Sequence, residues 1–107
     1  MAVLEVDKYT FEAEVLQAEG TVFVDYYAEG CVPCAALRPY VDRYAEKYGD
    51  KIKFCALSTT RARRLAVSQG ILGLPVMAVY QNGQKAEALV MGEATADTVR
   101  EMIEKYC

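Results

Sequence analysis

The sequence predicts an α/β sandwich built around a mixed β-sheet. Its 107 residues are enough for one domain with one core, and 53% of them are apolar at a net charge of −3, which excludes an intrinsically disordered chain. Strand and helix patterns follow one another in the order β-α-β-α-β-α-β-β-α. Strands joined through helical crossovers pair in parallel, whereas the last two strands are joined by a short turn and must be antiparallel.

The first half of the chain predicts two strands and two helices. A short strand at Val3–Asp7 leads to a helix that Thr10 would cap. Thr21–Tyr27 is a continuous run of β-forming residues, typical of a strand covered on both faces. A long helix follows from about Val32 to Tyr48, and Pro39 would kink it because proline removes one backbone donor. Its inward side chains would be Cys34, Leu37, Val41, Tyr44, Ala45 and Tyr48.

The second half predicts three strands and two helices. Asn82-Gly83 is a strong signal for a two-residue hairpin turn, because both of its positions need a positive φ. The last helix has an apolar face at helical spacing, made of Val99, Met102, Ile103 and Tyr106. In chain order the elements are a strand at Ile52–Leu57, a helix around Arg61–Gln69, strands at Val76–Gln81 and Gln84–Met91, and a helix capped by Thr95.

Charge and composition exclude several functions. The chain has 12 Lys and Arg against 15 Asp and Glu, so it lacks the basic excess with which nucleic-acid binders displace counterions from phosphates. It contains no His, which excludes a His-based catalytic triad and a zinc-peptidase helix. The longest apolar tract, Ile71–Tyr80, is about half the length needed to span a bilayer. Because nothing at the start of the sequence resembles a signal peptide, we expect a cytoplasmic protein that binds neither nucleic acid nor membranes.

The chemistry is expected at Cys31-Val32-Pro33-Cys34, which opens the longest predicted helix. Two cysteines three positions apart in a first helical turn lie on the same side, within disulfide distance. The helix N-terminus would lower the thiol pKa of Cys31 and make it the nucleophile, while Cys34 would resolve the mixed disulfide. Pro33 suits the start of the helix, where its missing N–H is not needed, and is expected to tune the dithiol.

Two other interpretations of the cysteine pair remain open. A structural zinc site needs four ligands, and besides the pair only Cys55, Cys107 and carboxylates could supply them. An iron–sulfur cluster would require the same distant cysteines to converge on the pair. The domain could also be a binding module without reductase activity, because a fold does not determine a function. Redox chemistry is favoured since the pair lies between a strand and a helix. Cys55 is then most simply a small buried hydrophobic residue.

Asp25 interrupts the apolar strand that precedes the cysteines. An ionised carboxylate is unfavourable to bury, and a position six residues before Cys31 can lie beneath the start of the helix. There a raised pKa would let Asp25 transfer a proton for Cys34 during resolution. The alternative is a carboxylate at a solvated end of the strand.

From Val24 to Cys34 the sequence resembles the thioredoxin family, and the resemblance covers almost the whole chain. Pro39 stands at the family's helix-kinking proline, and Ile71–Pro75 resembles the loop whose proline is cis and faces the dithiol. The resemblance implies a thioredoxin-like three-layer sandwich over residues 1–107, with a mixed sheet of about five strands flanked by four helices. The substrate-contacting residues that it implies are Gly30, Val32, Leu74 and Gly92, with Pro75 in the substrate loop.

Two stretches, Gly30–Cys34 and Ala62–Gln69, are similar to thioredoxins of clostridia that ferment amino acids, which serve glycine reductase systems. This similarity implies a cytosolic electron donor that reduces protein disulfides, is re-reduced by a flavin-containing thioredoxin reductase, and needs no cofactor besides its redox-active disulfide. We expect a monomer, since no long apolar edge calls for a dimer.

The sequence also departs from the family in ways that bear on the site. Gly30 stands where the family usually has a tryptophan, and Tyr27 stands where a second tryptophan is common. Ala56 stands where many members have a lysine near the buried aspartate. Because Val32-Pro33 adds no charge between the cysteines, we predict a reducing potential near about −270 mV, far from the roughly −120 mV of a strong oxidant.

Overall fold

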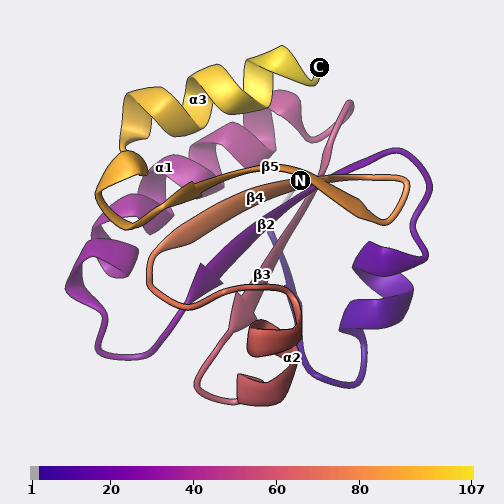
Figure 1. The fold of residues 1–107 in the computed structure, drawn as a ribbon. Coiled ribbons are helices and arrows are strands. Elements are labelled where there is room, and N and C mark those ends of the chain that lie inside the picture. Colours follow the sequence, from indigo (N-terminus) through magenta and orange to yellow (C-terminus); the bar gives the residue numbers. More distant parts are fainter. Residues whose placement is uncertain (1–2) are drawn as a thin grey trace.

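The computed structural model describes residues 3–107, in which a five-stranded mixed β-sheet lies between two layers of helices (Figure 1). The strands are β1 (Leu4–Val6), β2 (Thr21–Tyr27), β3 (Lys53–Ser58), β4 (Val76–Gln81) and β5 (Gln84–Val90). The helices are η1 (Glu12–Leu16), α1 (Val32–Tyr48), α2 (Arg63–Ser68) and α3 (Ala96–Lys105), with a short 3-10 turn, η2 (Met91–Glu93), after β5. The predicted three-layer α/β sandwich is confirmed.

The strands lie in the order β1-β3-β2-β4-β5. β1 and β2 both pair with β3 in parallel, and β4 pairs antiparallel with β2 and β5, as the crossovers and the hairpin predict. The hairpin turns at Asn82 and Gly83, whose φ values are 51° and 83°. A Cβ on Gly83 would lie 2.0 Å from the carbonyl oxygen of Leu16, so the close contact with η1 also requires glycine there.

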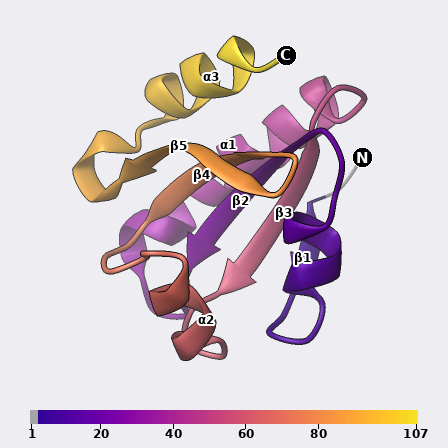
Figure 2. The ribbon, with the colours of Figure 1, turned by 45° about the vertical axis from the view of Figure 1, so that its right-hand side comes forward.

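Apolar side chains form one core on each face of the sheet, and β2 contributes to both. The helices η1 and α2 cover one face of the sheet, and α1 and α3 cover the other (Figure 2). Val22, Val24 and Tyr26 belong to the core on the side of η1 and α2, whereas Phe23 belongs to the core on the side of α1 and α3. Because side chains alternate along a strand, Asp25 lies on the same face as Phe23, beneath α1. Every residue of β2 from 22 to 26 is buried.

The helix α1 extends from Val32 to Tyr48, as predicted, and continues through Pro39. Tyr44 is only half-buried, although it was predicted to face inward. Its hydroxyl donates to the carbonyl of Ala96 at 2.7 Å, so this side chain joins α1 to the start of α3. The buried side chains of α1 are Cys34, Leu37, Val41, Ala45 and Tyr48.

The start of the first helix differs from the prediction, because Thr10 does not cap it. The Asp7 carboxylate accepts the backbone N–H groups of Tyr9 and Thr10 at 2.8 and 3.0 Å, while the Thr10 hydroxyl accepts the N–H of Asp7. The helix η1 that follows is a short π-helix, closed by a bond from the N–H of Gln17 to the carbonyl of Glu12 at 2.8 Å. An aspartate side chain readily accepts backbone N–H groups two and three residues after it, so Asp7 caps the turn that leads into the helix in place of Thr10.

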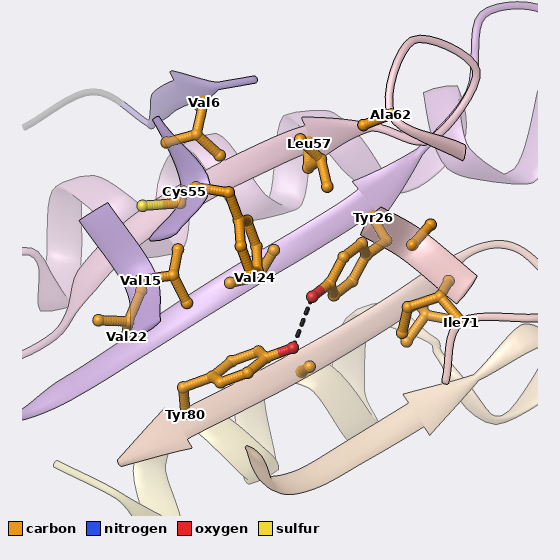
Figure 3. Close-up of a cluster of buried hydrophobic side chains, with 14 residues drawn as sticks. Val6, Val15, Val22, Val24, Tyr26, Cys55, Leu57, Ala62, Ile71 and Tyr80 are labelled. Carbon is orange, nitrogen blue, oxygen red and sulfur yellow. Dashed lines mark hydrogen bonds between the residues drawn. The ribbon is translucent and has the colours of Figure 1, made fainter. Parts of the chain in front are cut away.

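Two buried tyrosines form a polar link inside the core that η1 and α2 cover. The hydroxyls of Tyr26 on β2 and Tyr80 on β4 lie 2.6 Å apart (Figure 3). The Tyr80 hydroxyl also donates to Oε1 of Gln69 at 2.7 Å, so its oxygen accepts the hydrogen of Tyr26. The ring of Phe11 packs against both tyrosine rings, with centroids 6.3 and 6.2 Å away. The link therefore satisfies both hydroxyls.

This donor order predicts unequal effects of removing the two hydroxyls. Tyr80→Phe leaves the buried Tyr26 hydroxyl without an acceptor and is expected to lower the free energy of unfolding by about 1–3 kcal/mol. Tyr26→Phe leaves Tyr80 its bond to Gln69 and is expected to lower it by about 0.5–1.5 kcal/mol. Urea denaturation of both variants and of the double variant measures the difference. Equal and additive effects contradict the donor order.

Candidate active site

The cysteine pair lies on the first turn of α1, at the end of β2. Cys31 is the N-cap residue of the helix, and Cys31 and Cys34 form a disulfide with their Cα atoms 5.3 Å apart. The backbone N–H of Cys34 donates to Sγ of Cys31 at 3.3 Å. Cys31 is half-buried and Cys34 is buried, so a molecule that approaches from solvent reaches the sulfur of Cys31 first.

The local backbone explains why the sulfur of Cys31 meets the helix N-terminus. Gly30 has a φ of 84°, which a residue with a side chain adopts only with strain, and it turns the chain from β2 into α1. The N–H of Cys31 donates to the carbonyl of Ala28 at 3.2 Å and fixes this turn. At an N-cap the side chain faces unpaired backbone N–H groups and the positive end of the helix dipole. Such surroundings stabilise a thiolate relative to a thiol.

Asp25 is 0% exposed on β2, which contradicts the alternative of a solvated strand end. Its Oδ2 accepts a hydrogen bond from Nε of Arg38 at 3.1 Å. Its Oδ1 is buried and has no hydrogen-bond partner among residues 3–107. Burial raises the pKa of Asp25 to about 6, although the Arg38 guanidinium acts to lower it. The carboxyl therefore changes its protonation state close to neutral pH.

Arg38 is the ion-pair partner of Asp25, and no sequence pattern singled it out. It lies one helical turn after Cys34, so both side chains project from the face of α1 that covers the sheet. Its guanidinium also lies over the ring of Tyr27, 4.7 Å from the centroid, and the Tyr27 hydroxyl donates to Glu5 at 2.6 Å. The spacing from Cys34 was a usable signal, but a charged residue within a helix is ordinarily assigned to solvent.

Strand pairing brings a second segment to the same end of the sheet. Val76, the first residue of β4, pairs with Tyr26 near the end of β2 and with Val90 at the end of β5. The Leu74-Pro75 peptide bond just before β4 is cis, and the carbonyl of Pro75 accepts the N–H of Met91 at 2.7 Å. The loop before β4 and the turn after β5 thus lie at the end of the sheet from which α1 begins.

The residues expected to contact substrate are distributed around this end. Val32 is 79% exposed, Gly30 and Gly92 are exposed, and Leu74 is half-buried. A cavity of about 410 Å³ beside Cys34 includes Gly30 in its wall but none of the other three. The remaining lining residues of this cavity are Tyr27, Ala28, Glu29, Ala35, Arg38 and Pro39. Pro33 is exposed and lies between the two cysteines on the first turn of α1.

Residues 3–107 do not assemble a ligand set for a metal ion, since no three Cys, Asp or Glu side chains in this range converge. Cys55 is buried, and burial raises its thiol pKa to about 11, whereas Cys107 is exposed. No helix in the described part of the chain has the length and apolar character that crossing a membrane requires.

Comparison with known proteins agrees with this site and fold. The family described as Thioredoxin matches residues 2–105. The chain is 48% identical to a thioredoxin of Acetoanaerobium sticklandii over 104 residues, which cover 97% of this chain and 99% of the relative. It is 50% identical to a thioredoxin of Peptoclostridium acidaminophilum over 104 residues, which cover 97% and 94%. Thioredoxin 1 of a Nostoc species is 33% identical over 105 residues, 98% of this chain and 97% of the relative. The chain therefore belongs to the thioredoxin family and is a thiol–disulfide oxidoreductase.

Proposed function

We propose that this protein reduces disulfides of other proteins, with Cys31 as the attacking sulfur and Cys34 as the resolving sulfur. The observation that carries this assignment is the different placement of the two sulfurs. Cys31 is half-buried and its Sγ accepts the N–H of Cys34 at the helix N-terminus, whereas Cys34 is buried. The more accessible sulfur is thus also the one whose thiolate the backbone stabilises.

The exchange proceeds in two balanced steps. The Cys31 thiolate attacks a substrate disulfide, the substrate S–S bond breaks, and the first substrate sulfur leaves as a thiolate that takes up a proton. Cys34 then gives up its proton and attacks the sulfur of Cys31 in the mixed disulfide. The Cys31–Cys34 bond forms, the second substrate sulfur leaves as a thiolate, and two electrons have passed from the dithiol to the substrate.

We assign to Asp25 the proton of Cys34 in the second step. Its pKa of about 6 lets it exist largely as carboxylate at neutral pH while still accepting a proton, which is the property that a general base needs. Oδ1 has no other hydrogen-bond partner among the described residues and is free to accept. Its ion-pair partner Arg38 lies one turn from Cys34 on the same face of α1, which supports the assignment.

We propose that an extended segment of the substrate pairs with the backbone at Leu74, next to the cis Pro75, by strand addition. The half-buried Leu74 precedes β4 at the end of the sheet where α1 begins, which supports this route. Exposed Val32, Gly30 and Gly92 would contact the side chains on either side, and Pro33 would tune the dithiol.

We further propose that residues 1–107 act as one cytoplasmic, monomeric domain that a flavin-containing thioredoxin reductase re-reduces, with a glycine reductase system among its electron acceptors. The support is the similarity of Gly30–Cys34 to the corresponding stretch of thioredoxins that serve such systems. Capture of partners on the Cys34→Ser variant in cell extract tests the acceptor. Glycine reductase components among the captured proteins support the proposal, and their absence contradicts it.

The two cysteines should respond differently to substitution. Cys31→Ser removes the attacking sulfur. The variant is expected not to catalyse the reduction of insulin when dithiothreitol supplies the electrons. Cys34→Ser leaves the first step intact and is expected to accumulate the mixed disulfide, visible by mass spectrometry. Cys107→Ser, which changes an exposed cysteine, is the matched control and should retain wild-type activity. Insulin reduction by the Cys31→Ser variant would falsify the assignment.

Removing the proposed base should slow the second step. Asp25→Asn keeps the shape of the side chain but cannot take the Cys34 proton, and it is expected to slow resolution at neutral pH by about 10²-fold. In the wild-type protein the rate should rise as pH increases through about 6, as Asp25 ionises, and this rise should be absent from the variant. Single-turnover kinetics over a pH series measure both effects. Identical profiles contradict the role.

The same carboxyl makes a prediction about stability. Asp25 has a pKa of about 6 in the folded protein against an ordinary value of 3.8, so between these values the folded state binds more protons than the unfolded state. The contribution of Asp25 to the free energy of unfolding therefore decreases as pH rises through this window. Asp25→Asn should gain stability relative to wild type between pH 4 and pH 7 in urea denaturation. A difference that does not change with pH contradicts the raised pKa.

A further inference from the structure

The buried carboxyl of Asp25 obtains its cation from the helix above it and not from the sheet. Its neighbours in register are Ala56 on β3 and Met77 on β4, and neither side chain can donate a hydrogen bond or carry a charge. Arg38 of α1 supplies both, through the bond from Nε to Oδ2 at 3.1 Å. A hydrogen bond between charged groups away from water is among the stronger polar contacts in proteins.

Arg38 is itself held in place from a second side. Its guanidinium stacks on the ring of Tyr27, and the Tyr27 hydroxyl is bonded to Glu5 on β1. The side chain is 31% exposed and forms part of the wall of the cavity beside Cys34. A planar guanidinium fixed by a ring on one side and a carboxylate on the other has little freedom to turn. The ion pair with Asp25 is therefore pre-arranged before any substrate arrives.

The charged groups around Asp25 show that its ionisation depends on Arg38. Glu5 on β1 and Asp42 on α1 both disfavour the ionised carboxyl, as does burial, and the contribution of Arg38 is the one that opposes them. Tyr27 on β2 influences the site through its contact with Arg38. Loss of the guanidinium would leave Asp25 buried, facing two acidic groups, with nothing among the described residues to favour its carboxylate.

We propose that Arg38 is a positioning residue of the resolving step: its ion pair keeps the buried Asp25 ionised and holds Oδ1 free to accept the Cys34 proton. The inference rests on the proposed role of Asp25 as base. In that step the proton passes from Sγ of Cys34 to Oδ1 of Asp25, and the S–S bond between Cys34 and Cys31 forms. The substrate sulfur leaves with the electron pair of the mixed disulfide.

The test compares pH profiles of the resolving step in single turnovers. Arg38→Met keeps a long apolar side chain but removes the charge and the donor, and it should move the midpoint near pH 6 upward by about 1–3 pH units, with the same rate at high pH. Arg38→Lys keeps the charge, so its midpoint should lie close to that of the wild-type protein. Arg43→Met is the matched control, because Arg43 is an exposed arginine of α1 that stacks on Tyr40. Its profile should equal that of wild type.

A direct titration separates this proposal from the role of Asp25. Carboxyl NMR of the oxidised protein follows Asp25 without catalysis, and its midpoint should rise in Arg38→Met and remain unchanged in Arg43→Met. An unchanged Asp25 midpoint in Arg38→Met overturns the proposal for Arg38. A wild-type pH profile in Asp25→Asn instead overturns the proposed base while leaving the NMR result intact. If Arg38→Met does not fold, Arg38→Gln, which keeps a donor without the charge, replaces it in the same titration.

Discussion

The burial of β2 on both faces is the constraint on which the rest of the structure depends. Helices cover this strand on each side, and strands flank it along each edge. Any polar group on it must find its partner within the protein. Tyr26 does so through Tyr80 on β4, and Oδ2 of Asp25 does so through Arg38 on α1, whereas Oδ1 of Asp25 has no partner among the described residues. The same strand leads into the turn before Cys31, so the buried Asp25 and the cysteine pair lie at the same end of the sheet.

Much of the fold could be predicted because its strongest signals are local. The β-forming run of β2, the spacing of apolar residues in α1 and the Asn82-Gly83 turn each depend on neighbours in sequence, and each element has the expected place. The start of the first helix differs from the prediction because Asp7 and Thr10 bond to each other: the Asp7 carboxylate accepts the N–H of Thr10, and the Thr10 hydroxyl accepts the N–H of Asp7. Propensity ranks both as good caps and does not say which prevails.

The candidate site also has a part that the sequence indicates and a part that depends on how the elements pack. Cys31 and Cys34 form a motif with a fixed spacing, and Asp25 is conspicuous as a charge within an apolar strand, so the sequence indicates all three. Arg38 is different, because what matters is the side chain it meets across the packing of a helix on a sheet. The alternation of β2 directs Asp25 toward α1, but the residue of α1 that reaches it follows from the crossing of the two elements, which no sequence pattern specifies.

The spacing of Cys34 and Arg38 within one helix has a mechanical consequence. Hydrogen bonds along the backbone make a helix far stiffer than the loops that join it to the sheet, so side chains one turn apart keep their separation when the whole element shifts. A docking protein that tilts this helix therefore moves the sulfur of Cys34 and the guanidinium of Arg38 together. The resolving sulfur and the guanidinium therefore keep their relative positions under a load that would separate groups belonging to different elements.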